Sequence, residues 1–264
     1  KKIIVNLAPA TVRKRGASFD LPIALAVLAA MNYVPEEALK GVAVIGEVSL
    51  EGKIRGVSGV LPIVMEAKNQ GCTACILPEE NEIEGRLVSG IKILPADNLE
   101  KLCAYLNGDE KEIHRKKQGR SSAQRNIFEN KKEDFSDICG QNAVKRAAEI
   151  AVAGGHNLLM AGPPGSGKSM IARRIATILP ELSLEESLEI TRIYSVLGMI
   201  DKEQPLITRR PFRSVHHTIT KTALVGGGMT PRPGEISMAH GGVLFTGGTT
   251  TISCGCKNGA VKAA

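Results

Sequence analysis

A glycine-rich stretch at residues 162–169, GPPGSGKS, has the residue types and the spacing of a phosphate-binding loop. It matches the pattern GxxxxGK[ST], in which glycines let consecutive backbone N–H groups turn inward around a phosphate without a Cβ in the way. We expect Lys168 to reach the β- and γ-phosphates and to be the catalytic residue, and the Ser169 hydroxyl to hold Mg²⁺. The predicted cofactors are therefore ATP and Mg²⁺, bound by Gly162, Pro163, Pro164, Gly165, Ser166, Gly167, Lys168 and Ser169.

The segments on either side of this loop have the patterns of the elements that must position it. Residues 157–161 are a short apolar run, which predicts a strand, and residues 170–179 predict a helix. The loop therefore opens a helix, whose N-terminus adds partial positive charge beside the phosphate. Periodicity over residues 141–153 predicts a helix before the strand, and Ser183 with Glu186 has the capping-box spacing that starts another.

The apolar residues 243–245, VLF, predict a second strand that bears on hydrolysis. In a phosphate-binding ATPase, such a strand runs into acidic residues that hold magnesium and prime a water. Here the next residues are Thr246, Gly247 and Gly248, and no carboxylate follows up to the last residue. We therefore expect a site that binds ATP but hydrolyses it poorly, and the sequence leaves open whether this chain is an enzyme.

The first 108 residues predict a separate α/β domain. Apolar runs at residues 3–7 and 41–50 predict strands, and the sequence from Asp20, DLPIALAVLAAMN, predicts a buried helix. A closing helix is predicted after Asp97, which we expect to cap it.

The composition excludes several classes of protein. The chain is 43% hydrophobic and 23% charged, as expected of a globular protein, and no apolar run approaches the roughly 20 residues of a membrane helix. We therefore expect a cytoplasmic protein with no membrane partner. Residues 109–134 are charged and poor in apolar side chains, which indicates a linker. Cys72 and Cys75 form a CxxC pair, but a zinc site would need a second matched pair, so free thiols are expected.

Two blocks of sequence resemble a known family. GPPGSGKS following DICGQNAVKRAAEIA resembles an AAA+ module, whose Gly-Gln segment, here Gly140 and Gln141, lies beside the adenine. Residues 209–245, RRPFRSVHHTITKTALVGGGMTPRPGEISMAHGGVLF, resemble the magnesium-chelatase-like ATPases of the ComM/YifB family, bacterial proteins linked to competence. The resemblance covers essentially the whole chain. It implies an α/β fold with a Lon-protease/S5-like domain at residues 1–108 and a partial AAA+ P-loop NTPase domain at residues 135–245.

The resemblance also implies what the chain lacks. We expect a fragment that begins partway into the Lon-like domain and lacks the sensor residues, arginine finger and helical lid of an AAA+ module. Asp20 and Leu61 stand where a Lon protease has its serine nucleophile and its lysine base, so proteolysis is not expected.

The family offers a second explanation for the missing acids. In the family, the strand GVLF continues Leu-Asp-Glu-Leu-Pro-Glu-Phe. Codons for residues 249–253 can be chosen so that reading one base later gives Leu-Pro-Gln-Phe, and the same offset at residues 246–248 permits Leu-Glu-Glu. We therefore hypothesise that residues 246–264 are translated out of frame, and we expect them to be poorly ordered.

The resemblance implies partners as well. Intact relatives resemble hexameric ring ATPases that act on DNA branches during natural transformation, although a hexamer is not expected for this fragment. Arg209, Arg210 and Arg213 cluster with His216 and His217, which indicates either a DNA-facing loop or a solvated surface. The two histidines lack a third metal ligand. Two other functions stay open: a metal-chelatase ATPase subunit, which generally lacks the Lon-like domain, and a non-catalytic nucleotide-binding fragment.

Overall fold

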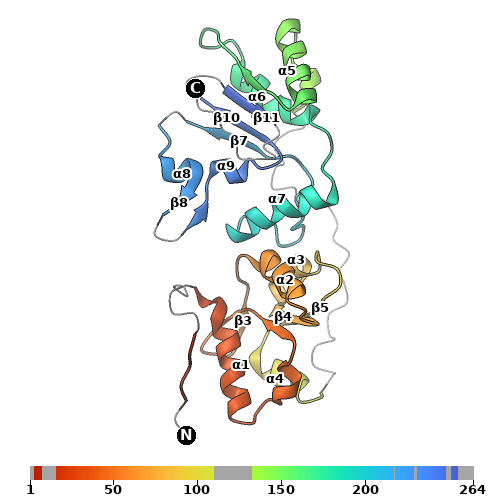
Figure 1. The fold of residues 1–264 in the computed structure, drawn as a ribbon, viewed down its shortest axis with the longest axis vertical. Coiled ribbons are helices and arrows are strands. Elements are labelled where there is room, and N and C mark those ends of the chain that lie inside the picture. Colours follow the sequence, from red (N-terminus) through yellow and green to blue (C-terminus); the bar gives the residue numbers. More distant parts are fainter. Residues whose placement is uncertain are drawn as a thin grey trace. The chain divides into compact units, whose positions relative to one another are not determined.

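The computed structural model describes residues 3–7, 16–109, 133–216, 218–228, 231–247 and, for the backbone, 251–254. The chain divides into two compact units (Figure 1). Unit 1 consists of Lys1–Gln124 and Asp201–Pro205, and unit 2 of Arg125–Ile200 and Leu206–Ala264. Within the described ranges, no helix is long and apolar enough to cross a membrane. The linker predicted at residues 109–134 falls almost wholly outside these ranges and stays a prediction.

Unit 1 is built from short helices and short strands around a parallel sheet. The sheet has the order β1-β4-β5, and β2 and β3 form a separate antiparallel hairpin. In chain order the elements are η1 (Ala17–Phe19), α1 (Asp20–Ala30), η2 (Glu36–Leu39), β1 (Val42–Val44), β2 (Glu47–Val48), β3 (Ile54–Arg55), α2 (Val60–Asn69), β4 (Ala74–Pro78), η3 (Glu79–Asn81), α3 (Glu82–Gly85), β5 (Lys92–Ala96) and α4 (Leu99–Leu106).

The parallel sheet of unit 1 is covered on both faces. Alternate residues of a strand point to opposite sides, so Ile76 of β4 packs with Leu21 and Leu25 on one face and Cys75 packs with Val60 on the other. Helices over both faces are the usual environment of parallel strands. Only Leu21 and Leu25 of α1 are buried, so the predicted buried helix is covered along one side.

Two expectations for unit 1 were wrong. Residues 3–7 form no strand, because no described strand pairs with them, and their side chains are exposed. The cap of α4 is Asn98 rather than Asp97: Asn98 has an extended backbone, and its side chain accepts a hydrogen bond from the Glu100 N–H at 2.8 Å. Asp97 instead forms an ion pair with Lys101 at 2.8 Å. The acidic side chain stands one residue too early to reach the free N–H groups of the first turn.

Unit 2 contains one four-stranded sheet and a two-stranded ladder of β8 and β9. In chain order its elements are η4 (Phe135–Asp137), α5 (Asn142–Gly154), β6 (Asn157–Leu159), α6 (Lys168–Ile175), η5 (Ala176–Ile178), α7 (Leu184–Val196), β7 (Phe212–Val215), α8 (Lys221–Val225), β8 (Gly226–Gly227), β9 (Arg232–Pro233), α9 (Glu235–Met238), β10 (Val243–Thr246) and β11 (Thr251–Cys254).

The four-stranded sheet sets the position of the glycine-rich loop. Its order is β6-β11-β10-β7, and β11 runs antiparallel to both β6 and β10. β6 and β10 therefore run in the same direction, and their carboxyl ends lie at one edge of the sheet. Leu159 and Thr246 are both in register with Thr251, so the chain leaves the two strands at the same level, about 10 Å apart across one intervening strand.

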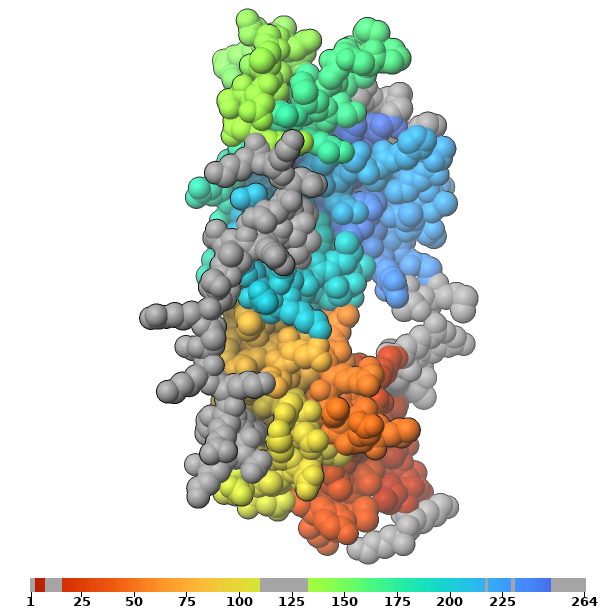
Figure 2. All heavy atoms as spheres, turned by 180° about the vertical axis from the view of Figure 1, so that it is seen from behind, coloured from red at the N-terminus to blue at the C-terminus, as the bar shows by residue number. Residues whose placement is uncertain are grey.

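The core of unit 2 packs helices α5 and α6 against this sheet. Met160, Ile171 and Phe245 are buried in one cluster with Ala148 of α5, and the rings of Phe212 and Phe245 stack with their centroids 6.3 Å apart. In the space-filling view, α5 in light green forms an outer wall of the unit (Figure 2). This packing fixes α6, and with it the loop, against the end of β6.

The structure corrects the expectation that residues 246–264 lack order. Thr246 closes β10 and Thr251–Cys254 form β11, so the expectation is wrong for these residues. An antiparallel strand between β6 and β10 pairs backbone groups that both strands would otherwise leave unpaired, and threonine and isoleucine favour an extended backbone. Residues 248–250 and 255–264 lie outside the described residues, and translation out of frame stays a hypothesis.

Candidate nucleotide-binding site

The glycine-rich loop connects β6 to α6 and turns sharply before the helix begins. Gly165 and Gly167 both have a φ of 81°, in the left-handed region that glycine adopts readily. Gly167 is the N-cap of α6, and the Ser166 N–H donates to the Pro163 carbonyl at 3.3 Å. The backbone therefore requires both glycines, and the loop delivers the chain to the N-terminus of a helix of 8 residues.

Lys168 closes the loop from its inner side. Its ammonium donates to the carbonyls of Gly162 at 2.9 Å and Pro163 at 2.8 Å, and to the hydroxyl of Ser166 at 3.0 Å. Lys168 is also the first residue of α6, where the helix N-terminus and the side-chain charge attract the same anion. Ser169 follows it and is exposed, so its hydroxyl is accessible to a metal ion beside the loop.

An apolar slot opens beside the loop and forms one cavity with it. The cavity has a volume of about 360 Å³, and Ser166 and Lys168 line it together with apolar side chains of three elements. Those side chains include Val144 and Ala147 of α5 and Ile171 of α6. The sequence analysis did not single out Val144 and Ala147, although their i, i+3 spacing on an apolar helix face is the signal that could have found them.

One member of the predicted base-binding pair, Gln141, lies at this slot. Gln141 lines the cavity and is the N-cap of α5. Its φ of 55° is a left-handed conformation that is uncommon for a residue with a Cβ, and Gly140 before it has a φ of 66°. Such conformations gather at ligand sites, where the surrounding structure holds them in place. An apolar slot with one amide at its mouth suits a flat heteroaromatic ring.

The end of β10 lies at the same sheet edge as the loop, and it carries no acid. Thr246 closes the strand, and the Gly247 N–H donates to the Val215 carbonyl at 2.9 Å. The described residues that follow Glu235 include no Asp or Glu. In the part of the chain that the structure describes, no three His, Cys, Asp or Glu side chains group as a metal site. Ser169 is therefore the side chain here that suits Mg²⁺, together with the oxygens of a bound phosphate.

Comparison with known proteins gives the family. The family model for magnesium chelatase, subunit ChlI, matches residues 134–253, and that for subunit ChlI of Mg-chelatase matches residues 1–81. The uncharacterized protein YifB of Escherichia coli is 44% identical over 245 residues, which are 93% of this chain and 47% of YifB. The competence protein ComM of Haemophilus influenzae is 42% identical over 252 residues, 93% of this chain and 48% of ComM. The chain belongs to the ComM/YifB family of magnesium-chelatase-like proteins.

Membership of the ComM/YifB family agrees with the fold. A Lon protease of Dictyoglomus thermophilum is 34% identical over 80 residues, 30% of this chain and 10% of that protease. The predicted fold class is confirmed: an α/β chain with a Lon-like N-terminal domain and a P-loop domain of the AAA+ type. The chain spans about half the length of the curated ComM/YifB relatives it matches.

Asp20 and Leu61 are the residues expected at the positions of the Lon serine and lysine, and the structure shows where each lies. Asp20 is the first residue of α1. Leu61 is fully buried in α2, and its N–H donates to the Glu84 carboxylate at 2.9 Å. A buried leucine offers no group that could deprotonate a nucleophile, and the lack of proteolysis by unit 1 stays a prediction.

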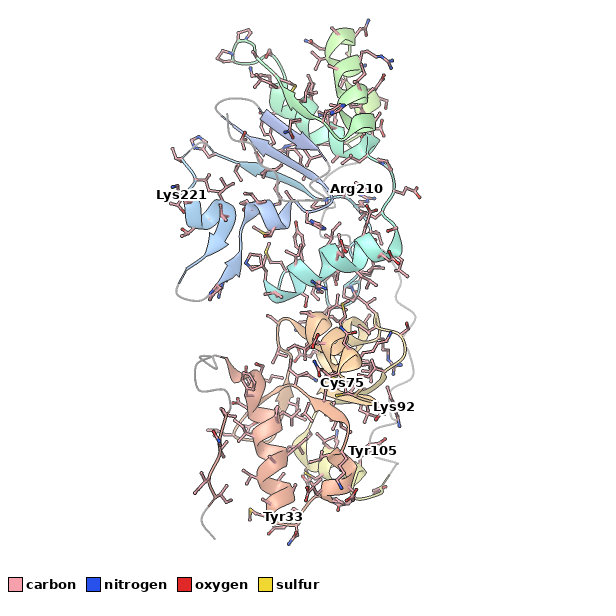
Figure 3. All side chains as sticks on the ribbon, in the orientation of Figure 1. Tyr33, Cys75, Lys92, Tyr105, Arg210 and Lys221 are labelled. Atoms are coloured by element: carbon pink, nitrogen blue, oxygen red, sulfur yellow. The ribbon has the colours of Figure 1, made fainter. Side chains whose placement is uncertain are left out.

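Arg210, which was predicted to face DNA, is engaged inside unit 2. Figure 3 shows its side chain between the sheet and α7. Arg210 donates to the carbonyls of Pro180 and Gly241, and to the carboxylate of Glu186 at 3.2 Å. These partners lie 24 or more residues away in the sequence and give Arg210 a structural role within unit 2. A DNA contact by Arg210 stays a prediction.

Arg213 also has a partner inside unit 2, and Arg209 is the exposed arginine of the three. Arg213 donates two hydrogen bonds to the Glu235 carboxylate, at 2.6 and 2.8 Å. The pair lies beside Tyr194, whose pKa burial raises to about 12. A bidentate ion pair of this kind fixes the guanidinium within unit 2, and a DNA contact by Arg213 stays a prediction.

The described histidine and cysteine candidates form no metal site. The His216 ring nitrogen Nδ1 lies 2.9 Å from the Thr218 hydroxyl, and His217 lies outside the described residues. Cys72 and Cys75 are free thiols, and burial raises the pKa of Cys75 to about 11. A thiol with so high a pKa carries little thiolate at neutral pH, which fits the prediction of free thiols.

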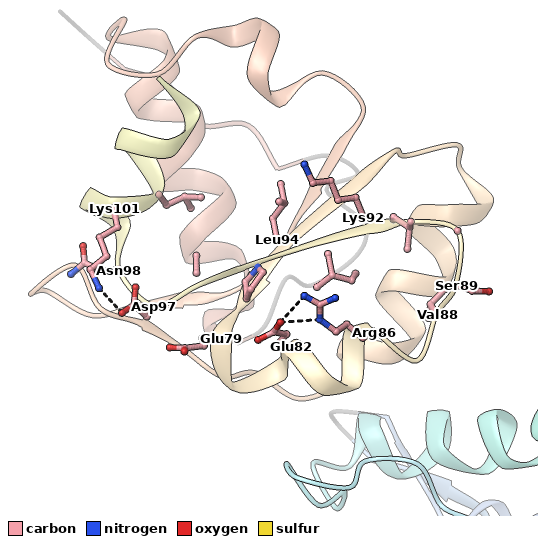
Figure 4. A pocket seen from close by; sticks show the side chains of 16 residues that line it. Glu79, Glu82, Arg86, Val88, Ser89, Lys92, Leu94, Asp97, Asn98 and Lys101 are labelled. Carbon is pink, nitrogen blue, oxygen red and sulfur yellow. Dashed lines mark hydrogen bonds and ion pairs between the residues drawn. The ribbon is translucent and has the colours of Figure 1, made fainter. Parts of the chain in front are cut away.

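A larger hollow in unit 1 has different chemistry. A groove of about 660 Å³ follows β5 (Figure 4). Four of its charged side chains form two ion pairs, Glu82 with Arg86 at 2.7 Å and Asp97 with Lys101 at 2.8 Å, and Glu79 and Lys92 line it as well. This groove has no phosphate-binding sequence pattern in its lining, whereas the cavity at Lys168 is lined by residues of GPPGSGKS, so the cavity at Lys168 is the better candidate nucleotide site.

Proposed function

We propose that this chain is the ATP-binding module of a ComM/YifB-type AAA+ ATPase. The observation that carries the proposal is the single cavity in which Ser166 and Lys168 of the loop meet the apolar slot. The loop backbone and the N-terminus of α6 would hold the phosphates, and Lys168 would neutralise their charge. Ser169 would hold Mg²⁺, and the slot with Gln141 would hold the base. Bound Mg²⁺ neutralises charge that develops on the phosphate oxygens.

We further propose that the chain binds ATP without efficient turnover. Hydrolysis needs carboxylates that complete the magnesium shell and orient the attacking water, and Thr246 and Gly247 occupy the end of β10 instead. The phosphate contacts of the loop are independent of that strand end. Turnover is expected to be lower by a factor of about 100 or more, since the loss of one preorganised group at a reacting centre has an effect of that size.

For the whole protein, the proposed role is DNA processing during natural transformation. The name of the competence protein ComM, 42% identical, supports this role. Arg209 is the exposed arginine of the basic cluster and could meet a phosphate backbone. A hexameric ring is the proposed assembly of the whole protein, of which this chain spans about half by comparison with its relatives.

A metal-chelatase ATPase subunit is the second candidate. Both matching family models carry the description of the chelatase subunit ChlI, but the Lon-like domain of unit 1 favours the ComM/YifB role. The test is phosphate release by a variant with an acidic pair restored after β10, with and without branched DNA. Faster phosphate release in the presence of branched DNA would support DNA processing, and the same rate with and without DNA would contradict it.

The binding proposal itself is tested by competition. A fluorescent ATP analogue bound to the chain should be displaced by unlabelled ATP in the presence of Mg²⁺, and displaced far less well by AMP, because the loop binds the β- and γ-phosphates. Equal displacement by ATP and AMP would contradict the proposal.

A further inference from the structure

Every hydrogen-bond donor of the Lys168 ammonium has a partner within the loop. An ammonium has three N–H donors and no acceptor. In this structure the three acceptors are the Gly162 carbonyl, the Pro163 carbonyl and the Ser166 hydroxyl, at 2.9, 2.8 and 3.0 Å. A phosphate oxygen can therefore bind the lysine only after one of these three partners has left it.

The three partners differ in how easily they can leave. The carbonyls of Gly162 and Pro163 belong to the backbone of the loop, which the Ser166 N–H to Pro163 carbonyl bond at 3.3 Å holds in its turn. The Ser166 hydroxyl is on a side chain that changes partner by rotation about one bond. Ser166 is thus the partner that a phosphate displaces at the smallest structural cost.

The Ser166 side chain also lies across the loop. A Cβ added to Gly162 would lie 3.3 Å from the Ser166 hydroxyl oxygen, so the hydroxyl faces the backbone where the loop begins. Ser166 lines the same cavity as Lys168. Its hydroxyl therefore accepts from the lysine at the cavity where the lysine is expected to bind its ligand.

We propose that Ser166 is a positioning residue that holds Lys168 in the ligand-free loop and slows the entry of the triphosphate. The inference rests on the proposed function, because the ligand is the phosphate chain of ATP. It assigns to Ser166 a role that the phosphate-binding pattern does not, since Ser166 occupies a variable position of GxxxxGK[ST].

The first experiment needs no nucleotide. Lys168 in the ligand-free chain is acylated with an N-hydroxysuccinimide ester, and its modification rate is measured by peptide mass spectrometry with Lys221, which is exposed, as the internal standard. Ser166→Ala should raise the Lys168 rate about three- to tenfold, the size expected for the loss of one hydrogen bond to a charged group. Ser166→Thr keeps the hydroxyl and should keep the wild-type rate.

The second experiment measures nucleotide entry by stopped flow with a fluorescent ATP analogue. Ser166→Ala should raise the association rate constant about three- to tenfold and leave the dissociation rate constant within about twofold, and Ser166→Thr should match the wild type. An unchanged Lys168 acylation rate in Ser166→Ala overturns the inference, and so does faster acylation without faster association. If the wild-type chain binds no nucleotide, the proposed function fails, and the acylation rates still decide whether Ser166 holds Lys168.

Discussion

The ends of β6 and β10 lie at the same edge of one sheet, yet only β6 leads into the groups of an ATPase site. Beyond β6, the loop brings Lys168 to three acceptors and to the N-terminus of α6. Beyond β10 come Thr246 and Gly247, with no carboxylate on any described residue that follows. The difference teaches that phosphate binding draws on backbone groups and one cation, whereas hydrolysis needs carboxylates at fixed points. A chain can therefore lose the carboxylates needed for hydrolysis and still bind phosphate.

The contrast between the two strand ends depends on phosphate binding by the loop after β6. Lys168→Ala tests that binding and is the variant with the largest expected effect. It removes the one cationic side chain among the described residues that line the cavity. The affinity for MgATP should fall about 30- to 1000-fold, or about 2–4 kcal/mol, because charge-assisted hydrogen bonds are lost. Isothermal titration calorimetry measures it. Lys145→Ala on α5, outside the cavity lining, is the control, and equal losses in both variants would refute the assigned role.

A second variant tests how much the buried ion pair next to β10 stabilises unit 2. Arg210 is 10% exposed, pairs with Glu186 and donates to the Gly241 carbonyl just before β10. Arg210→Ala should lower the free energy of unfolding of unit 2 by about 2–3 kcal/mol, because it leaves a largely buried carboxylate without its cation. Urea denaturation measures the change. Arg209→Ala, at an exposed position, should stay within about 0.5 kcal/mol, and a similar loss in both would show that burial of the pair is unimportant.

The β10 end can be tested by supplying the acids it lacks. A Cβ added at Gly247 would lie 3.6 Å from the Val215 carbonyl oxygen, an ordinary contact, so a side chain has room there. Gly247→Asp combined with Gly248→Glu should raise ATP turnover at least about tenfold, and ATP affinity should change by less than about threefold. The matched control is Gly247→Asn with Gly248→Gln. Equal phosphate release by the acid and amide variants would mean that this strand end plays no part in hydrolysis.

Ser169→Ala should have the smallest effect, since Mg²⁺ keeps its phosphate and water ligands. The affinity for ATP in the presence of Mg²⁺ should fall about fivefold, or about 1 kcal/mol, and the affinity measured with excess EDTA should stay unchanged. Parallel ATP titrations with Mg²⁺ and with excess EDTA measure the two affinities. A loss that persists in EDTA would place Ser169 in the loop's own structure rather than at the metal.

The sequence predicted those parts of the site that depend on near neighbours. The loop is eight consecutive residues, and the capping box of Ser183 and Glu186 spans one turn; both of its hydrogen bonds are present at 3.1 Å. The partners of Arg210 and Arg213 were missed, because those pairs join residues 24 and 22 positions apart. No local pattern reveals such pairs before the fold brings them together.

The strands show the same limit. An apolar run predicted a strand at residues 3–7, where no described strand pairs with it, and no alternation predicted β11, which lies between two partners. A strand forms where its backbone N–H and C=O groups can pair with a neighbouring strand. The residues of the strand itself predict this pairing only in part. The missing acids at the end of β10 were easier to predict, because the sequence itself shows that no Asp or Glu follows this strand.

The central claim is most directly tested by titrating this chain with MgATP in a calorimeter and following phosphate release in the same sample. We predict saturable heat for one ATP per chain and phosphate release no faster than in buffer. No saturable heat, or turnover as fast as in the double variant Gly247→Asp with Gly248→Glu, would contradict it.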